Sequence, residues 1–145
     1  MTGKPKALVS HVGIAVADLD AAIAVYRTLT GSEPLLIEEV ADQQVRVAMF
    51  ATGGADTAGG RVELLQATSD TSPIARYIDR RGEGLHHICL YVDDIETRLN
   101  ELREAGVRLI DEQPRRGAEG KRVAFVHPQS CQGVLIELEE REKGH

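Results

Sequence analysis

The sequence lacks an excess of positive charge: among its 145 residues, 17 Lys and Arg stand against 23 Asp and Glu, a formal net charge of −6. Proteins that bind nucleic acid need surplus Lys and Arg to neutralise phosphates, so this balance argues against such a function. Long apolar runs are missing as well, and none approaches the ~20 residues of a membrane span. We therefore expect neither nucleic acid nor a membrane among the partners of this chain.

Cysteine is scarce too, and the pair Cys89 and Cys131 is too few for a disulfide framework. The N-terminal segment MTGKPKALVSHV lacks the apolar stretch of a secretory signal peptide. These features predict a cytoplasmic protein with two free thiols. With 42% hydrophobic residues and no linker-like stretch, the chain is expected to form a single domain over residues 1–145.

What the sequence does contain is one segment in two copies. HVGIAVADLDAAI begins at His11, and HICLYVDDIETRL repeats its pattern from His87. Later in each copy a short apolar stretch carries a carboxylate, Glu63 in VEL and Glu137 in IEL, at separations of 52 and 50 residues from the respective histidine. Two copies of one module, each with one His and one Glu, predict a four-ligand divalent metal site on a pseudo-two-fold axis.

Periodicity predicts the same secondary structure in both copies. HVGIAV and HICLYV alternate with the period of a half-buried strand, and a helix follows each. The first helix has Asp18 as its cap and ends at Gly31; the second has Asp93 or Asp94 as its cap and ends at Gly106. Three strands then follow in each copy, near PLLIEEV, RVAMFA and RVELLQ in the first and near VRLID, RVAFVHP and GVLIELEE in the second.

Each copy is thus interpreted as a βαβββ module, the first over about residues 8–68 and the second over about residues 84–140. A connecting helix over about residues 72–82 has Ser72 as its cap, Pro73 at its first position and Gly82 as its end. The predicted fold class is α+β, with the two modules forming a curved, mostly antiparallel sheet around a metal site.

Strand alternation predicts where the four candidate ligands point. Val62 and Leu64 share the face opposite Glu63, and Ile136 and Leu138 share the face opposite Glu137. His11 and His87 are likewise opposite the aliphatic rows of their own strands. Because a buried carboxylate without a partner is costly, two glutamates and two histidines on the faces away from the helices imply a cation.

Simpler interpretations apply to each residue taken alone, because a lone strand His is more often structural than a ligand. A Glu near a strand end is usually solvated, so it is the repetition of both residues at matching offsets that favours the metal site. His86 and His127 are expected to be hydrogen-bonding residues. Cys89 shares the face of His87, and a small packed thiol is its expected role.

These residues carry a family resemblance over residues 11 to about 140. The two modules resemble the vicinal oxygen chelate (glyoxalase) superfamily, and the second half resembles the methylmalonyl-CoA epimerase family within it. The motifs that carry this resemblance in combination are GEGLHHI followed by VDDIE, and RVAFVHP followed by GVLIEL. The resemblance implies that His11, His87 and Glu137 are metal ligands, with Glu63 at a position where the family has Gln or Glu. It further implies a homodimer and a coenzyme A thioester substrate.

The implied reaction interconverts (2R)- and (2S)-methylmalonyl-CoA by removal and return of the α-proton through a metal-chelated enolate. One divalent ion per chain would act as Lewis acid, and four protein ligands leave two positions of an octahedron for a bidentate substrate. The His and carboxylate donors suit Co²⁺, Mn²⁺, Ni²⁺, Zn²⁺ or Fe²⁺ alike, and Co²⁺ is the expectation carried forward.

The chain departs from the family at one position that bears on mechanism. Some members use a second Glu, which is not a metal ligand, as a catalytic carboxylate. The corresponding residue of this chain, within QVRVAMF, is Val47. Instead it has Glu63 where those members carry Gln. We therefore expect Glu63 and Glu137 to supply the acid and the base, as ligand glutamates do in the glyoxalase I branch.

Three other functions share parts of this pattern. A glyoxalase I-type lyase would use the same ligand geometry and would act on a hemithioacetal. A ligand-sequestering protein of the bleomycin-resistance kind would hold no metal. A ring-cleaving dioxygenase fits less well, because those enzymes usually need four modules and a three-ligand iron site.

Overall fold

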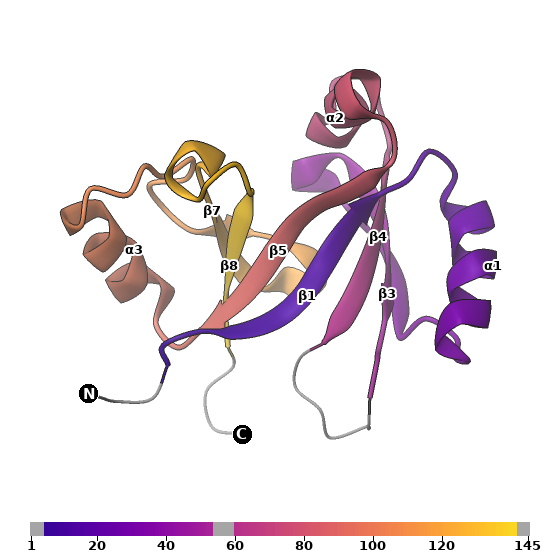
Figure 1. The fold of residues 1–145 in the computed structure, drawn as a ribbon, viewed down its shortest axis with the longest axis horizontal. Helices are drawn as coiled ribbons and strands as arrows, with labels where there is room; N and C mark the ends of the chain where they lie inside the picture. The colour runs from indigo at the N-terminus through magenta and orange to yellow at the C-terminus, as the bar shows by residue number, and fades with distance from the viewer. Residues whose placement is uncertain (1–4, 54–59, 142–145) are drawn as a thin grey trace. The chain divides into compact units, whose positions relative to one another are not determined.

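The computed structural model of the chain describes residues 5–53 and 60–141. The chain divides into two compact units, a first unit of His11–His86 and a second unit of Met1–Ser10 with His87–His145. Figure 1 shows their elements along the chain. No helix within the described ranges is long and apolar enough to cross a membrane. That residues 1–145 form a single domain stays a prediction.

The first unit has the predicted βαβββ order, followed by the connecting helix. Its strand order is β2-β3-β4-β1, in which β1 runs parallel to β4 and the other neighbours are antiparallel. Its elements are β1 (Leu8–Ala15, which begins in the second unit), α1 (Leu19–Thr30), β2 (Leu36–Val40), a 3₁₀ turn (Ala41–Gln43), β3 (Val45–Phe50), β4 (Arg61–Ala67) and α2 (Pro73–Arg81).

The second unit repeats this order with the same pairing directions. Its strand order is β5-β8-β7-β6, with β5 parallel to β8 and the remaining pairs antiparallel. Its elements are β5 (Gly84–Val92, which begins in the first unit), α3 (Ile95–Glu104), β6 (Arg115–Arg116), β7 (Arg122–Val126) and β8 (Ile136–Glu140), with 3₁₀ turns at Ala118–Gly120 and Pro128–Ser130. The predicted α+β class and the two βαβββ modules are confirmed.

The helix ends follow the predicted capping chemistry. Asp18 accepts a hydrogen bond from the Ala21 N–H at the start of α1, and Asp94 accepts one from the Thr97 N–H at the start of α3. Ser72 caps α2 in the same way, ahead of Pro73. Each cap satisfies a backbone donor that has no partner within the first turn, which sets where each helix begins.

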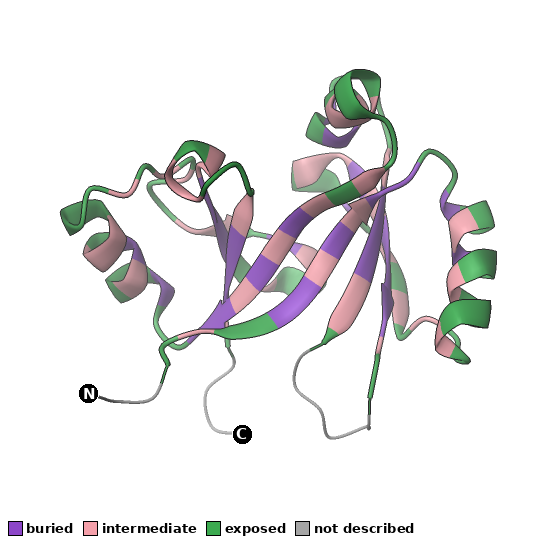
Figure 2. Ribbon diagram, viewed as in Figure 1, coloured by how far each residue is buried: buried purple, intermediate pink, exposed green. Residues whose placement is uncertain are grey.

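Each unit buries its aliphatic residues between its helix and one face of its strands. In the first unit Leu19 and Ile23 of α1 pack with Phe50 and Leu64 of the strands. In the second unit Ile95 and Leu99 of α3 pack with Ala124, Val126 and Leu138. Figure 2 shows burial alternating along β5, where His87, Cys89 and Tyr91 are buried and Ile88 and Leu90, between them, are half-buried. The glutamates between these aliphatic residues therefore point to the opposite faces of their strands.

The apolar face of α1 is buried along only part of the helix. Leu29 fits the helical spacing of the apolar residues but is 69% exposed. It lies in the last turn of α1, beyond Tyr26, which is the last α1 side chain packed against the core. The buried part of the apolar face thus ends one turn before the helix does.

The strand predicted at VRLID does not form. At Leu109 there is an isolated bridge to Val126, and the short strand β6 lies further along at Arg115–Arg116. The backbone N–H groups of Ile110 and Asp111 both donate to the carbonyl of Phe125, at 2.9 and 3.2 Å. Two residues facing one partner residue are the arrangement of a β-bulge, which interrupts regular pairing.

Candidate functional site

In the first unit, His11 and Glu63 lie side by side on neighbouring parallel strands. Glu63 on β4 is in register with Gly13 on β1, two residues beyond His11, so all three are on one face. His11 Nε2 is 3.4 Å from Glu63 Oε1, and the two residues are 3% and 4% exposed. The structure thus brings together the imidazole and carboxylate that the first copy of the repeat predicts.

The second unit contains the equivalent pair. Glu137 on β8 is in register with Cys89 on β5, two residues beyond His87. His87 Nε2 is 3.2 Å from Glu137 Oε1, and the two residues are 4% and 6% exposed. The same pairing therefore arises at the same place in both modules, because both use a parallel contact between their first and last strands.

The donor atoms in each pair have a spacing that suits a shared cation. Two atoms bound to one ion at about 2.1 Å lie roughly 3.0 Å apart at a right angle and about 3.4 Å apart at the tetrahedral angle. The observed 3.4 and 3.2 Å fall in this range. Imidazole nitrogen with carboxylate oxygen is a donor set for divalent transition metals, and burial makes the carboxylates costly without a positive charge.

The face that carries Glu137 holds two further buried polar groups. Glu139, two residues along β8, is 8% exposed, and the fully buried Cys89 places its Sγ 3.8 Å from Glu139 Oε1. Cys89 is the packed thiol that its position predicts. Glu139 was not among the predicted site residues, although the i, i+2 spacing in IELEE is the signal that puts it on the face of Glu137.

An aromatic ring and a cation also lie on this face. Phe125 of β7 is directly opposite Glu137, and its ring is 6.2 Å from the His87 ring, edge to face. The Arg115 guanidinium lies over the Phe125 ring, 5.3 Å from its centroid. Neither residue was predicted as part of the site, because their contact depends on the pairing of β6 with β7, and single-strand periodicity does not specify that pairing.

Val47, the departure from the family pattern, is 1% exposed on the Glu63 face of the first unit. It is directly opposite Leu65 on β4, two residues from Glu63, and opposite Glu38 on β2. An aliphatic side chain cannot carry a proton, so this position supplies no acid or base.

Of the two histidines expected to be hydrogen-bonding residues, His127 is confirmed in that role, whereas the contact that the structure shows for His86 is a ring contact. The His86 ring lies edge to face with Tyr77 of α2, with the ring centroids 4.9 Å apart. His127 Nδ1 accepts a hydrogen bond from the Gln129 N–H at 3.0 Å. His86 and His87, though adjacent, therefore present their imidazoles to opposite sides of β5.

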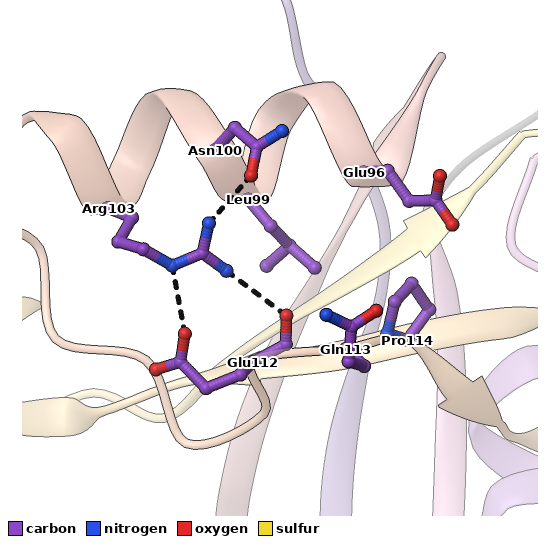
Figure 3. A pocket seen from close by; sticks show the side chains of 7 residues that line it. All are labelled: Glu96, Leu99, Asn100, Arg103, Glu112, Gln113 and Pro114. Carbon is purple, nitrogen blue, oxygen red and sulfur yellow. Dashed lines mark hydrogen bonds and ion pairs between the residues drawn. The ribbon is translucent and has the colours of Figure 1, made fainter.

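A cavity of about 390 Å³ lies between α3 and the segment before β6 in the second unit (Figure 3). Arg103 spans it, donating to Glu112 Oε1 at 2.8 Å and to Asn100 Oδ1 at 2.6 Å. Leu99, another lining residue, belongs to the core under α3. The cavity is thus on the helix-covered side of the strands, whereas Glu137 points to the other side.

Comparison with known proteins supports the same interpretation. The profile of the Glyoxalase/Bleomycin resistance protein/Dioxygenase superfamily matches residues 10–125. Over 133 residues the chain is 38% identical to an ethylmalonyl-CoA/methylmalonyl-CoA epimerase of Cereibacter sphaeroides, covering 90% of this chain and 96% of that protein. It is 36% identical to the mitochondrial methylmalonyl-CoA epimerase of Bos taurus over 90% of this chain and 73% of that one.

Solved structures give the same picture. The methylmalonyl-CoA epimerase of Mycobacterium tuberculosis superposes with a TM-score of 0.85 at 39% identity, covering 92% of this chain and 87% of that one. A methylmalonyl-CoA epimerase in complex with methylmalonyl-CoA and NH4+ superposes with a TM-score of 0.86 at 36% identity, over 93% of this chain and 94% of that one.

Proposed function

We propose that this chain, which belongs to the glyoxalase/bleomycin resistance protein/dioxygenase superfamily and within it to the methylmalonyl-CoA epimerases, interconverts (2R)- and (2S)-methylmalonyl-CoA. The observation that carries the proposal is the presence of two buried His–Glu pairs, one at the equivalent place in each module. The identity of the substrate is inferred from the relatives. One is an ethylmalonyl-CoA/methylmalonyl-CoA epimerase, and another is a methylmalonyl-CoA epimerase in complex with methylmalonyl-CoA.

One divalent cation per chain is proposed to be held by His11, Glu63, His87 and Glu137. The spacing and burial within each pair support this ligand set, and Co²⁺ is the first choice among the metals that suit it. When bound, the cation would supply Lewis acidity toward the oxygens of the substrate, which favours loss of the α-proton. The four residues are 3–6% exposed, which limits the access of water to them.

Proton transfer is proposed to fall to Glu63 and Glu137. Each is a buried carboxylate next to an imidazole, and the aliphatic Val47 cannot itself act as an acid or a base. One carboxylate would remove the α-proton and the other would return a proton to the opposite face of the same carbon. General acid–base catalysis of this kind contributes about 10²- to 10⁴-fold to a rate.

We further propose that the chain acts as a homodimer in the cytoplasm. Within the described part of the first unit, β2 pairs only with β3, and Leu35 and Ile37 at this edge are 56% and 45% exposed. Apolar side chains beside an unpaired strand edge are a surface that a second copy could cover. Sedimentation velocity at micromolar concentration should then give the mass of a dimer, and a monomer would contradict this part of the proposal.

The decisive experiment follows the α-proton of methylmalonyl-CoA in deuterated water by NMR, with and without added Co²⁺. Washout of the proton and formation of both isomers, dependent on metal, are the expected results. A hemithioacetal of glutathione is assayed in parallel with the same preparation. If methylmalonyl-CoA keeps its α-proton while the hemithioacetal is converted, the chain is a glyoxalase I-type lyase and the proposal is wrong.

A further inference from the structure

Strand register places Arg115 on the same face of the second unit as Glu137. Arg115 on β6 is directly opposite Val123 on β7, and Val123 is directly opposite Glu139 on β8. Residues opposite one another on antiparallel strands point to the same face, so Arg115, Glu139 and Glu137 share one. Arg116, the next residue, points to the other face.

Phe125 and Asp111 help to hold the guanidinium of Arg115 in position. It lies over the ring of Phe125, and its Nε is 3.6 Å from Asp111 Oδ2. The same Oδ2 accepts a hydrogen bond from the Phe125 N–H at 2.8 Å, so the carboxylate is tied to the strand that carries the ring. An arginine oriented in this way loses little conformational freedom when it binds a planar anion.

Charge and exposure at this face point to an anionic ligand. The Arg115 side chain is 38% exposed, whereas Glu137 and Glu139 are 6% and 8% exposed. An anion approaching two buried carboxylates is repelled unless positive charge faces it, and the Arg115 guanidinium supplies such a charge in addition to that of the proposed metal ion. The fork of N–H donors on a guanidinium matches the two oxygens of a carboxylate.

The position of Arg115 identifies which part of the substrate it would meet. Phe125 contacts both the Arg115 guanidinium and the His87 ring, so a single aromatic ring separates Arg115 from a proposed metal ligand. That is the end of the site where the acyl group reacts. The anionic group at that end of methylmalonyl-CoA is the carboxylate on the α-carbon, whereas the phosphates belong to the coenzyme A arm.

We infer that Arg115 binds the free carboxylate of the acyl group and thereby selects malonyl-type thioesters over simple acyl thioesters. The inference rests on the proposed function and extends it to a specificity-determining residue. It predicts that Arg115 contributes to the affinity for methylmalonyl-CoA and contributes nothing to the affinity for propionyl-CoA, which differs by lacking this carboxylate.

The test is titration calorimetry of both thioesters against the unaltered chain, Arg115→Gln, Arg115→Lys and the matched control Arg116→Gln. Loss of a charge-assisted, bidentate contact weakens binding by about 10- to 100-fold. Arg115→Gln should therefore raise the Kd for methylmalonyl-CoA by this factor and leave that for propionyl-CoA within about twofold. Arg115→Lys, which keeps the charge without the fork, should fall between, and Arg116→Gln should change neither Kd.

Each other outcome has a distinct meaning. Equal weakening of both thioesters in Arg115→Gln and Arg115→Lys would mean that Arg115 binds the coenzyme A phosphates or only maintains the fold, and would overturn the inference. No weakening of either would overturn it as well. If the unaltered chain does not epimerise methylmalonyl-CoA, the proposed function itself fails, which the proton-exchange assay reports independently of these variants.

Discussion

Replacing His87 by alanine should release the metal while leaving the fold in place. The change removes Nε2, which lies 3.2 Å from Glu137 Oε1, and leaves a carboxylate that is 6% exposed. Loss of a residue that only hydrogen-bonds to a metal ligand already lowers metal affinity by about 10- to 100-fold. Loss of one of four ligands should therefore lower the affinity about 100-fold or more, which corresponds to about 2.8 kcal/mol at 1.4 kcal/mol per tenfold.

The measurement is the metal-to-protein ratio by mass spectrometry after dialysis against a series of buffered free Co²⁺ concentrations. His86→Ala is the matched control, since His86 is the adjacent residue on β5 and contacts Tyr77 on the other side of the strand. The control should keep the affinity of the unaltered chain. Circular dichroism of each variant verifies that any loss of metal is not a loss of fold.

The double variant His11→Ala, His87→Ala provides the stricter test. It leaves Glu63 and Glu137 as the remaining proposed ligands, and carboxylates alone hold these metals loosely at neutral pH. If the double variant still bound one metal ion per chain at the affinity of the unaltered protein, the ligand assignment and the reasoning from the repeat would both be wrong.

Three further predictions follow from the same structure. Glu63→Gln and Glu137→Gln should each nearly abolish epimerisation, and isotope exchange should show that each variant still exchanges the α-proton of one isomer; near-normal turnover of Glu63→Gln with metal bound would reduce Glu63 to a ligand. Leu99→Ala, at a residue 1% exposed in the core of the second unit, should lower the free energy of unfolding in urea by about 2–5 kcal/mol, whereas Leu29→Ala, at 69% exposure, should change it by less than about 0.5 kcal/mol. Burial raises the pKa of the Cys131 thiol, so its thiolate forms at higher pH than that of a free cysteine, and iodoacetamide should alkylate it slowly near neutral pH and faster as the pH rises; fast labelling at pH 7 would contradict this.

Local features of the fold were predictable because their causes are local. A cap such as Asp94 bonds to a backbone N–H three residues away, so the cap and the start of its helix appear together in the sequence. The direction of Glu63 and of Glu137 was predictable for a similar reason, since alternation along one strand needs no knowledge of its partner. The repeat then made the two candidate pairs equivalent.

The interruption at VRLID shows where this kind of inference ends. An apolar alternation is present in the segment, yet Ile110 and Asp111 share one acceptor on β7, and the Asp111 side chain takes the Phe125 N–H that a regular ladder would give to a backbone carbonyl. A bulge forms where two residues of one strand lie opposite a single residue of its partner, so it depends on how the two strands pair. Periodicity within one strand contains no information about that.

By itself, then, the sequence determined the order of elements, the helix ends and the faces that His11, Glu63, His87 and Glu137 occupy, because each follows from spacing along a single segment. Only the tertiary structure decided that each imidazole lies within 3.4 Å of its glutamate and that Arg115 is stacked on Phe125 beside this site. Those contacts join residues from 10 to 52 positions apart in the sequence. Local propensity is compatible with many strand pairings, and only the packing of the folded chain determines which of them forms.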